Sequence, residues 1–342
     1  MAGIFTPRHL FLVNRLQQQG VAFNLEESLT QPYYPLRAAL TAYFTVGELG
    51  ALTYVVRDNT GEARMEGFIQ LRERRSRPEA DVLFIAPALT GNVDPGVWHH
   101  LLTHACQQAG GRGVERLFAC LPEGGGEVNL FSQVGFNVYT RGDLFCFDGG
   151  KPVEIVSLPD AAIRSCRTED AIALQQLYAT VAPRLVQQAE NVTGQCRFCP
   201  PDVWPVADTR RGYVLEKNGE IVGCLTVRSG RIGHWLYVLL HPQLYDHADL
   251  LVAHGLAALR DAPLAPIYCS VREYQGGLRA VLEDLGFDLF VSRALMVKHT
   301  TARVADTVRK LVPALDKRAE ITTPTVSPIN SHRATGNAEP IN

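Results

Sequence analysis

Two stretches of this chain are versions of one phrase: Leu130-Phe131-Ser132-Gln133-Val134-Gly135-Phe136 and Val281-Leu282-Glu283-Asp284-Leu285-Gly286-Phe287. In each, a helix-like run ends in Gly-Phe, and an apolar stretch suited to a strand follows at 137–147 and at 288–299. Glycine is the residue best suited to the left-handed position that closes a helix. The two glycines are 151 positions apart (286 − 135 = 151). The phrase therefore predicts that one helix-to-strand unit occurs twice.

Other landmarks recur in the same order before each Gly-Phe. They are Tyr54-Val55-Val56 and Tyr213-Val214-Leu215, Gly67 and Gly223, Pro87 and Pro242, and Cys120 and Cys269. The offset within each pair drifts by a few residues, as insertions in loops would cause. A repeat of about 150 residues indicates a tandem duplication.

The second copy has the clearer pattern of elements. A strand at 163–167 precedes a helix that Thr168 can cap, with one apolar face of Leu174, Leu177, Tyr178 and Val181. Asn218-Gly219 is a strong hairpin signal between two strands. A helix after Pro242, a strand at 267–271 and a helix at 278–285 follow, and 287–299 is long enough for two strands or one bent strand. This order predicts an α/β fold with a mixed sheet.

The predicted boundaries follow the repeat. They are a divergent first domain at 1–148, a linker at 149–162, a second domain at 163–300, a short helix at 301–320 and a disordered tail at 321–342. The first domain begins differently from the second, with helices expected at 10–19 and 35–44. The tail is rich in Thr, Pro, Ser and Asn and has no apolar periodicity.

Bulk properties exclude several classes of protein. The formal net charge of −2 provides no basic field for nucleic acid, and no apolar run approaches the roughly 18 residues of a membrane span. The first 16 residues do not have the pattern of a signal peptide. Eight scattered cysteines are typical of reduced thiols, so we expect a cytoplasmic protein. Cys196 and Cys199 have the spacing of a metal pair, but no second pair follows, and we expect a loop and no metal.

The order of elements, the strand-Pro junction before a helix and the helix-Gly-Phe-strand ending resemble the GCN5-related N-acetyltransferase (GNAT) superfamily. The resemblance covers residues 10–148 and, more closely, 160–300. It implies two tandem acyl-CoA N-acyltransferase-like domains. In that family acetyl-CoA lies where two neighbouring parallel strands separate, and a glycine-containing loop at a helix N-terminus holds its diphosphate.

Carried onto the second copy, the resemblance implies a cofactor site of Leu239, Leu240 and His241 on the strand and Tyr245, His247 and Ala248 on the loop. The loop departs from the family pattern. It has no glycine, and it carries Asp246 and Asp249, whose carboxylates would repel a diphosphate. The corresponding loop of the first copy, 90–95, has one glycine out of register and Pro95. We therefore expect acetyl-CoA to be held weakly, through its pantetheine arm.

The catalytic positions also depart from the family. The tyrosine that often protonates the leaving thiolate corresponds to Leu282 and Phe131, which have no proton to donate. The asparagine that keeps the strands apart corresponds to Gln275 and Gly124. The base position corresponds to His234 in the second copy and to Glu79 in the first.

His234 is a candidate base near neutral pH, and Tyr237 and Tyr274 are candidate acids. The alternative is that the histidine is packed beside Trp235 and that the tyrosines belong to the core.

The sequence therefore favours an acyl-CoA-dependent N-acyltransferase that transfers acetyl to an amine of a small molecule or peptide, with one copy structural. The alternative is a non-catalytic binding or scaffold protein that kept the fold. Aminoacyl transfer from tRNA is disfavoured by the near-neutral charge.

Overall fold

A computed structural model describes residues 2–45, 47, 49–58, 65–74, 77–89, 94–149, 161–190 and 210–300. Met1–Ala302 form one compact unit. The helix expected at 301–320, the tail at 321–342, the Cys196/Cys199 pair and nearly all of the linker lie outside the described residues.

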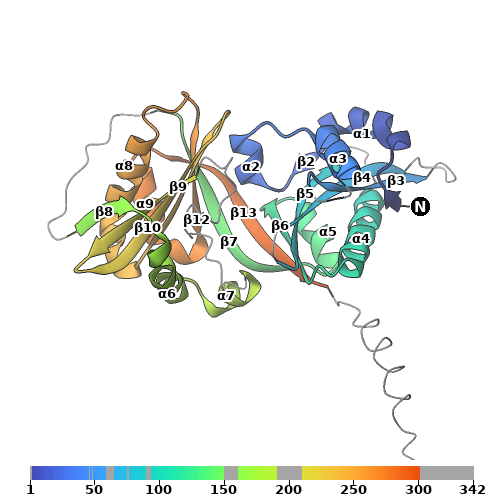
Figure 1. The fold of residues 1–342 in the computed structure, drawn as a ribbon. Helices are drawn as coiled ribbons and strands as arrows, with labels where there is room; N and C mark the ends of the chain where they lie inside the picture. Colours follow the sequence, from blue (N-terminus) through green and yellow to red (C-terminus); the bar gives the residue numbers. More distant parts are fainter. Residues whose placement is uncertain are drawn as a thin grey trace, which may run out of the picture. The chain divides into compact units, whose positions relative to one another are not determined.

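The first half of the chain begins with short elements and then builds a sheet (Figure 1). Its elements are β1 (Ala2–Ile4), α1 (Leu10–Leu16), β2 (Val21–Ala22), α2 (Leu25–Thr30), α3 (Pro35–Phe44), β3 (Leu52–Asp58), β4 (Met65–Glu73), β5 (Glu79–Ala86), α4 (Pro95–Gly111), β6 (Arg116–Pro122), α5 (Glu127–Gln133) and β7 (Asn137–Phe147). The Asp94 side chain caps α4 by accepting the Gly96 N–H, and Pro95 occupies the first turn, where no N–H is needed.

The second half repeats the later part of this order. Its elements are β8 (Ala161–Ser165), α6 (Ala171–Val181), α7 (Arg184–Glu190), β9 (Arg210–Lys217), β10 (Glu220–Ser229), β11 (His234–Leu240), α8 (Ala248–Ala258), β12 (Ile267–Arg272), α9 (Gly277–Asp284) and β13 (Asp288–His299), with 3-10 turns at Thr168–Asp170, Pro242–His247 and Glu273–Gln275. The hairpin predicted at Asn218-Gly219 is confirmed: both residues have positive φ, 53° and 80°.

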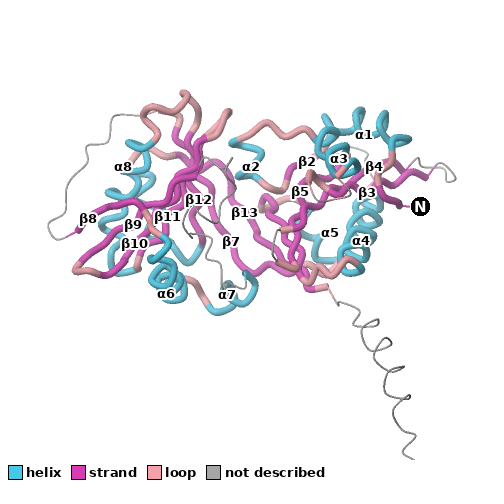
Figure 2. The backbone as a smooth tube through the Cα atoms, viewed as in Figure 1, coloured by secondary structure: helices cyan, strands magenta, loops and turns pink. Residues whose placement is uncertain are grey.

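The strands form one mixed sheet, and helices cover it (Figures 1 and 2). The strand order is β1-β3-β4-β5-β6-β13-β7-β12-β11-β10-β9-β8, and β2 pairs with β5 off this path. Among the described strands the parallel pairs are β5 with β6 and β11 with β12, one in each half. The predicted α/β class is confirmed, and the stretch after Phe287 is one strand with a register shift between Leu289 and Val291.

The two halves exchange their last strands. β7 of the first half pairs with β12 of the second, β13 of the second pairs with β6 of the first, and β7 and β13 pair with each other. The domain boundaries expected from the repeat divide the chain at 149–162. In the sheet, however, each half is completed by a strand from the other half. One continuous sheet is the result.

The repeated phrase closes both cores. Gly135 and Gly286 have φ of 93° and 86°, so each ends its helix in the left-handed region. Phe136 packs under α4 and α5, and Phe287 packs under α8 and α9. Both side chains are almost completely buried.

Candidate active site where parallel strands separate

Each half contains a pair of parallel strands that separate after a few residues. β5 and β6 pair only from Glu79–Asp81 to Arg116–Phe118. β11 and β12 pair only from His234–Tyr237 to Ile267–Ser270. Past these points the two strands of each pair no longer bond to each other, and a ligand can lie at such a separation in an open sheet.

In the first half, the chain itself fills the separation. β2 pairs with the free edge of β5 at Ile85 and Phe84. The Phe23 N–H donates to Leu83 O at 2.8 Å, and the Ala88 N–H donates to Gln19 O at 2.6 Å. The Phe23 ring lies 5.8 Å from the Trp98 ring and 5.4 Å from the Phe131 ring, between their centroids. The edge of β5 therefore has no room for a ligand.

Glu79, the candidate base of the first copy, is held in a buried ion-pair cluster. Its carboxylate lies 2.8 Å from Arg74 Nη1, 2.9 Å from Arg116 Nη2 and 3.8 Å from Arg77 Nη1. The side chain is 1% exposed. Three cations stabilise the charged carboxylate, so this geometry is that of a structural ion pair and not of a base.

In the second half, a glutamine side chain keeps the strands apart. Gln275 Nε2 donates to Val238 O at 2.7 Å, and Gln275 Oε1 accepts the Arg272 N–H at 3.0 Å. The side chain is fully buried. Since alternate residues of a strand turn their backbone groups to the same edge, Leu240 faces this opening as Val238 does. Gln275 thus has the strand-separating position that its spacing from Gly286 predicted.

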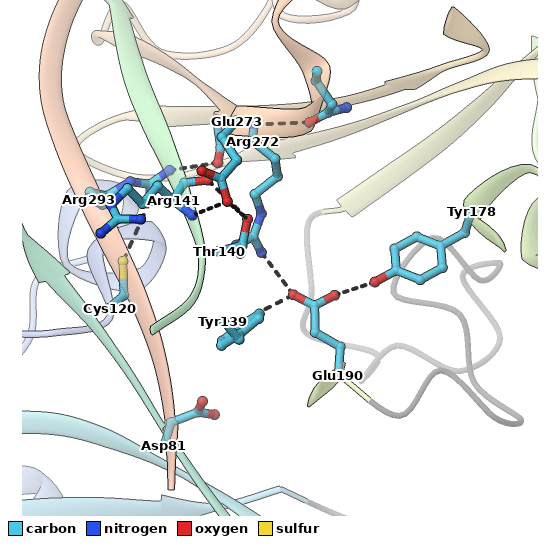
Figure 3. A network of polar contacts seen from close by, with 12 residues as sticks. Asp81, Cys120, Tyr139, Thr140, Arg141, Tyr178, Glu190, Arg272, Glu273 and Arg293 are labelled. Atoms are coloured by element: carbon cyan, nitrogen blue, oxygen red, sulfur yellow. Dashed lines mark hydrogen bonds and ion pairs between the residues drawn. The ribbon is translucent and has the colours of Figure 1, made fainter. Parts of the chain in front are cut away.

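A polar cluster lies beside this separation, where Glu190 of α7 meets Tyr178 of α6, Tyr139 of β7 and Arg272 of β12 (Figure 3). The Glu190 carboxylate accepts hydrogen bonds from Tyr178 Oη at 2.7 Å and Tyr139 Oη at 3.1 Å, and it pairs with Arg272 Nη2 at 3.1 Å. Tyr139 is the unopposed residue of a bulge, because Leu295 pairs with Thr140 and Met296 with Val138. Bulges of this kind re-aim side chains next to functional sites.

Burial sets the protonation of the tyrosines. It raises the pKa of Tyr237 well above its ordinary value, and Tyr274 adds to the effect. Burial and the Glu190 carboxylate raise the pKa of Tyr178 in the same direction. Burial disfavours the charge of Arg272, but Glu190 and the neighbouring tyrosines together outweigh it and raise the pKa of the guanidinium. Near neutral pH the tyrosines are hydrogen-bond donors, and Arg272 is a cation.

His234 lies away from the separation, at the first residue of β11. Its ring is 2% exposed, Nδ1 accepts the Gly230 N–H at 3.3 Å, and Nε2 lies 2.8 Å from Pro263 O. A carbonyl at Nε2 requires a proton there, so both ring nitrogens are used by the backbone. This is the packed histidine of the alternative interpretation, and the ring has no lone pair left for an acceptor amine.

The loop after β11 does not fit a diphosphate. The His241 Nδ1 accepts the Gln243 N–H at 3.4 Å and His241 O accepts the Leu244 N–H at 2.9 Å, so these donors are used within the turn. Asp249 adds a carboxylate to the first turn of α8. The Tyr245 ring packs on Gly277, where an added Cβ would lie 2.6 Å from Tyr245 Cδ2.

The remaining residues expected at the cofactor site belong to the strand and to the start of α8. Leu239 and Leu240 are buried on β11, Ala248 is buried at the first residue of α8, and His247 precedes it. The loop offers no cradle for the diphosphate that the family's cofactor carries.

The chain was compared with known proteins. No family model and no curated protein matches it. Its structure is similar to a tandem GNAT protein from the clavulanic acid biosynthesis pathway, with a TM-score of 0.51 and 17% identity over 88% of this chain and 98% of that one. It is also similar to a GCN5-related N-acetyltransferase from Sphaerobacter thermophilus, with a TM-score of 0.53 and 15% identity over 88% of this chain and 95% of that one.

The chain has the tandem GNAT fold. Each half of this chain contains one separation of parallel strands. At this level of identity the likeness establishes the fold, and the activity rests on the residues themselves.

Several residues of the polar cluster carry no signal in the sequence. Glu190 ends α7 and Arg272 ends β12, and their spacing of 82 residues corresponds to no motif. Only the sheet, which places β7 beside β12, brings Tyr139 to them. Among the described residues, no group of His, Cys, Asp and Glu could hold a metal ion, and no helix is long and apolar enough to cross a membrane.

Proposed function

We propose that this GNAT-fold protein is an N-acyltransferase whose second half carries the reaction and whose first half is structural. The observation that supports the proposal is the separation of β11 from β12, which Gln275 bridges and past which none of the described strands pairs with that edge of β11. The equivalent edge of β5 is paired with β2. A single acyl donor per chain follows from this difference.

The residues around the separation of β11 from β12 would have different roles in the reaction. The edge of β11 would hold the pantetheine arm of an acyl-CoA, which supplies an activated thioester. Tyr237 is the last residue of β11 that pairs with β12, and its hydroxyl stays protonated, so it can donate a hydrogen bond to the leaving sulfur. Glu190 is engaged by two hydroxyls and a guanidinium, which suits it to positioning Arg272.

The acceptor amine must arrive deprotonated. Of the described groups beside this separation, the Glu190 carboxylate is engaged by two hydroxyls and a guanidinium, and the hydroxyls of Tyr178 and Tyr237 stay protonated near neutral pH, so none of them is placed to take a proton from the amine. Nucleophilic attack forms the N–C bond, breaks the C–S bond and releases a thiol. The rate should follow the fraction of neutral amine.

The test is turnover of acetyl-CoA by the full chain with a panel of primary amines, in which release of the thiol is measured. Tyr237→Phe should lower kcat by roughly tenfold to a hundredfold, the value of one donor at a developing charge. Tyr33→Phe is a matched control, since Tyr33 is a mostly buried tyrosine of the first half whose hydroxyl binds Gln70. Equal rates for wild type and Tyr237→Phe would exclude the role of Tyr237.

A non-catalytic binding protein is the second candidate. The observation that favours it is the turn after β11, where His241 takes the donors that a diphosphate would need. The two functions differ in a direct way: a binding protein releases no thiol with any amine, at any pH, while it still binds a ligand in the second half.

A further inference from the structure

Two arginines lie in one row across the centre of the sheet, at the junction of the two halves. Arg272 of β12 pairs with Gly142 of β7, and Gly142 pairs with Arg293 of β13. Residues paired across antiparallel strands face the same side, so the two arginine side chains share a face. Gly142 lies between them and contributes no side chain. The row is thus two cations with a gap in the middle.

Both guanidinium groups are buried and incompletely bonded. Arg272 is 4% exposed and Arg293 is 5% exposed. Arg293 Nη2 donates to Ser270 Oγ at 2.7 Å, Nη1 lies 4.0 Å from Cys120 Sγ, and the group lies 5.8 Å from the centroid of the Trp235 ring. Among the residues that the structure describes, Arg272 Nε, Arg272 Nη1 and Arg293 Nε have no hydrogen-bond partner.

The charges of this row do not balance. Glu190 is the carboxylate in contact with Arg272, while the polar contacts of Arg293 are a hydroxyl and a thiol. Two nearby carboxylates are engaged elsewhere: Glu273 accepts from Thr140 and Arg141 N, and Asp143 accepts from Ser292 and Arg279. Burial, reinforced by Arg272, lowers the pKa of Arg293. A buried cation without an anion is destabilising, so one bound negative charge would stabilise this part of the fold.

The row adjoins the strand separation. Ser270 of β12, which binds Arg293, is paired with Tyr237, and Tyr237 is the last residue of β11 that pairs with β12. A ligand held by the arginines would therefore lie beside the Tyr237 hydroxyl.

We propose that Arg272 and Arg293 bind the carboxylate of a small organic acid, with the unpartnered N–H groups donating to its oxygens. A surplus of one positive charge matches a monoanion better than dianionic phosphate, and a guanidinium fork fits a planar carboxylate. If the proposed function holds, this acid is the acyl acceptor, an amine that also carries a carboxylate. Binding of the carboxylate does not depend on that function.

The test is calorimetric titration of the full chain, without an acyl donor, with glycine, β-alanine and 4-aminobutyrate, and with the amide of each. We expect saturable binding of at least one acid and at least tenfold weaker binding of its amide. Arg293→Met should weaken binding by roughly tenfold to a hundredfold, as expected for loss of a charge-assisted contact. Arg141→Met is the control, since Arg141 is an exposed arginine of the same β7 and should leave binding unchanged.

A stability measurement separates this role from a structural one. Arg293→Met removes an uncompensated buried charge, so its melting temperature without ligand should equal or exceed that of the wild type. Arg272→Met removes the guanidinium that pairs with Glu190 and should melt lower. A large loss of stability in Arg293→Met would mean that this arginine is a structural residue, and would overturn the proposal.

The remaining outcomes are also decisive. Absence of saturable binding for every acid at millimolar concentration would overturn the proposal, and so would tighter binding of inorganic phosphate than of any carboxylate. Binding without thiol release from acetyl-CoA would support the carboxylate site and count against the acyltransferase. Thiol release with amines that lack a carboxylate, at the same rate, would support the transferase and count against the acid as its acceptor.

Discussion

A single glutamine distinguishes the two strand separations of this molecule. Gln275 bridges Val238 O and the Arg272 N–H, whereas the corresponding position in the first half is Gly124, which has no side chain. Its place was predictable because only a short turn and the helix α9 separate it from Gly286, and the interval of 11 residues from Gly124 to Gly135 is the same (286 − 275 = 135 − 124 = 11).

Gln275→Ala should remove both function and stability. The substitution leaves the Val238 carbonyl and the Arg272 N–H buried without partners. Each such group lowers the free energy of unfolding by about 1–3 kcal/mol. We expect lower stability in chemical denaturation and no detectable acyl-donor binding. Gln70→Ala is the matched control: Gln70 is equally buried, and it binds Pro35 O and Thr53 in the first half. If both variants lost binding equally, the role of Gln275 would be only structural.

His234→Ala should keep its turnover. The ring is buried with both nitrogens bonded to the backbone at Gly230 and Pro263, so its loss should lower stability by about 1–3 kcal/mol. Steady-state rates corrected for folded protein would test this. A loss of kcat above tenfold, with the fold intact, would restore His234 as a catalytic group.

The pH profile follows from the tyrosines. Since burial raises the pKa of Tyr237, its hydroxyl remains protonated as pH rises, and the neutral form of the acceptor amine increases over the same range. The rate should therefore increase from pH 6 to about 9 without a descending limb. A bell-shaped profile centred near neutral pH would indicate an acid and base that this account does not contain.

At the scale of elements, the decisive feature is β2. Two residues of strand, Val21 and Ala22, occupy the edge of β5, and Phe23 follows them into the aromatic cluster. Nothing in the sequence predicted this pairing, because a two-residue strand has no periodicity and its partner is 62 residues away. Each half has one separation of parallel strands, and β2 occupies the one in the first half.

Phe23→Ala should cost about 3–5 kcal/mol, as expected for a large aromatic removed from a packed core. It should not create a second donor site, since the backbone bonds of β2 to β5 remain. Denaturant unfolding measures the first effect, and the stoichiometry of acyl-donor binding measures the second. Two donors bound per chain in this variant would show that the ring alone excludes the ligand.

At the scale of the whole molecule, the exchange of β7 and β13 makes each half depend on the other. The Asn218-Gly219 hairpin and the two Gly-Phe closures follow from local pattern, so the sequence predicted them. The exchange of the last strands does not follow from local pattern, because β7 and β13 have the same apolar pattern and each could complete either half. The row of Arg272, Gly142 and Arg293 exists only through this exchange.

The exchange predicts how the halves behave when separated. Residues 1–149 expressed alone would leave the edge of β6 without β13, and residues 150–342 would leave β12 without β7. We expect each fragment to be aggregation-prone alone. Co-expressed fragments should form a 1:1 complex with the sheet restored. Two separately soluble, cooperatively folding fragments would contradict the exchanged arrangement.

The central claim is that one half holds an acyl donor by the edge of β11, without a cradle for the diphosphate. Calorimetric titration of the full chain with acetyl-CoA and with acetyl-pantetheine, which lacks the diphosphate, tests it most directly. We predict one site per chain, which is lost in Gln275→Ala. The affinities for the two ligands should agree within about threefold, because the diphosphate has no cradle and adds less than the 1.4 kcal/mol that would separate them tenfold. Two sites, no binding of either ligand, or acetyl-CoA binding a hundredfold more tightly than acetyl-pantetheine would contradict the account.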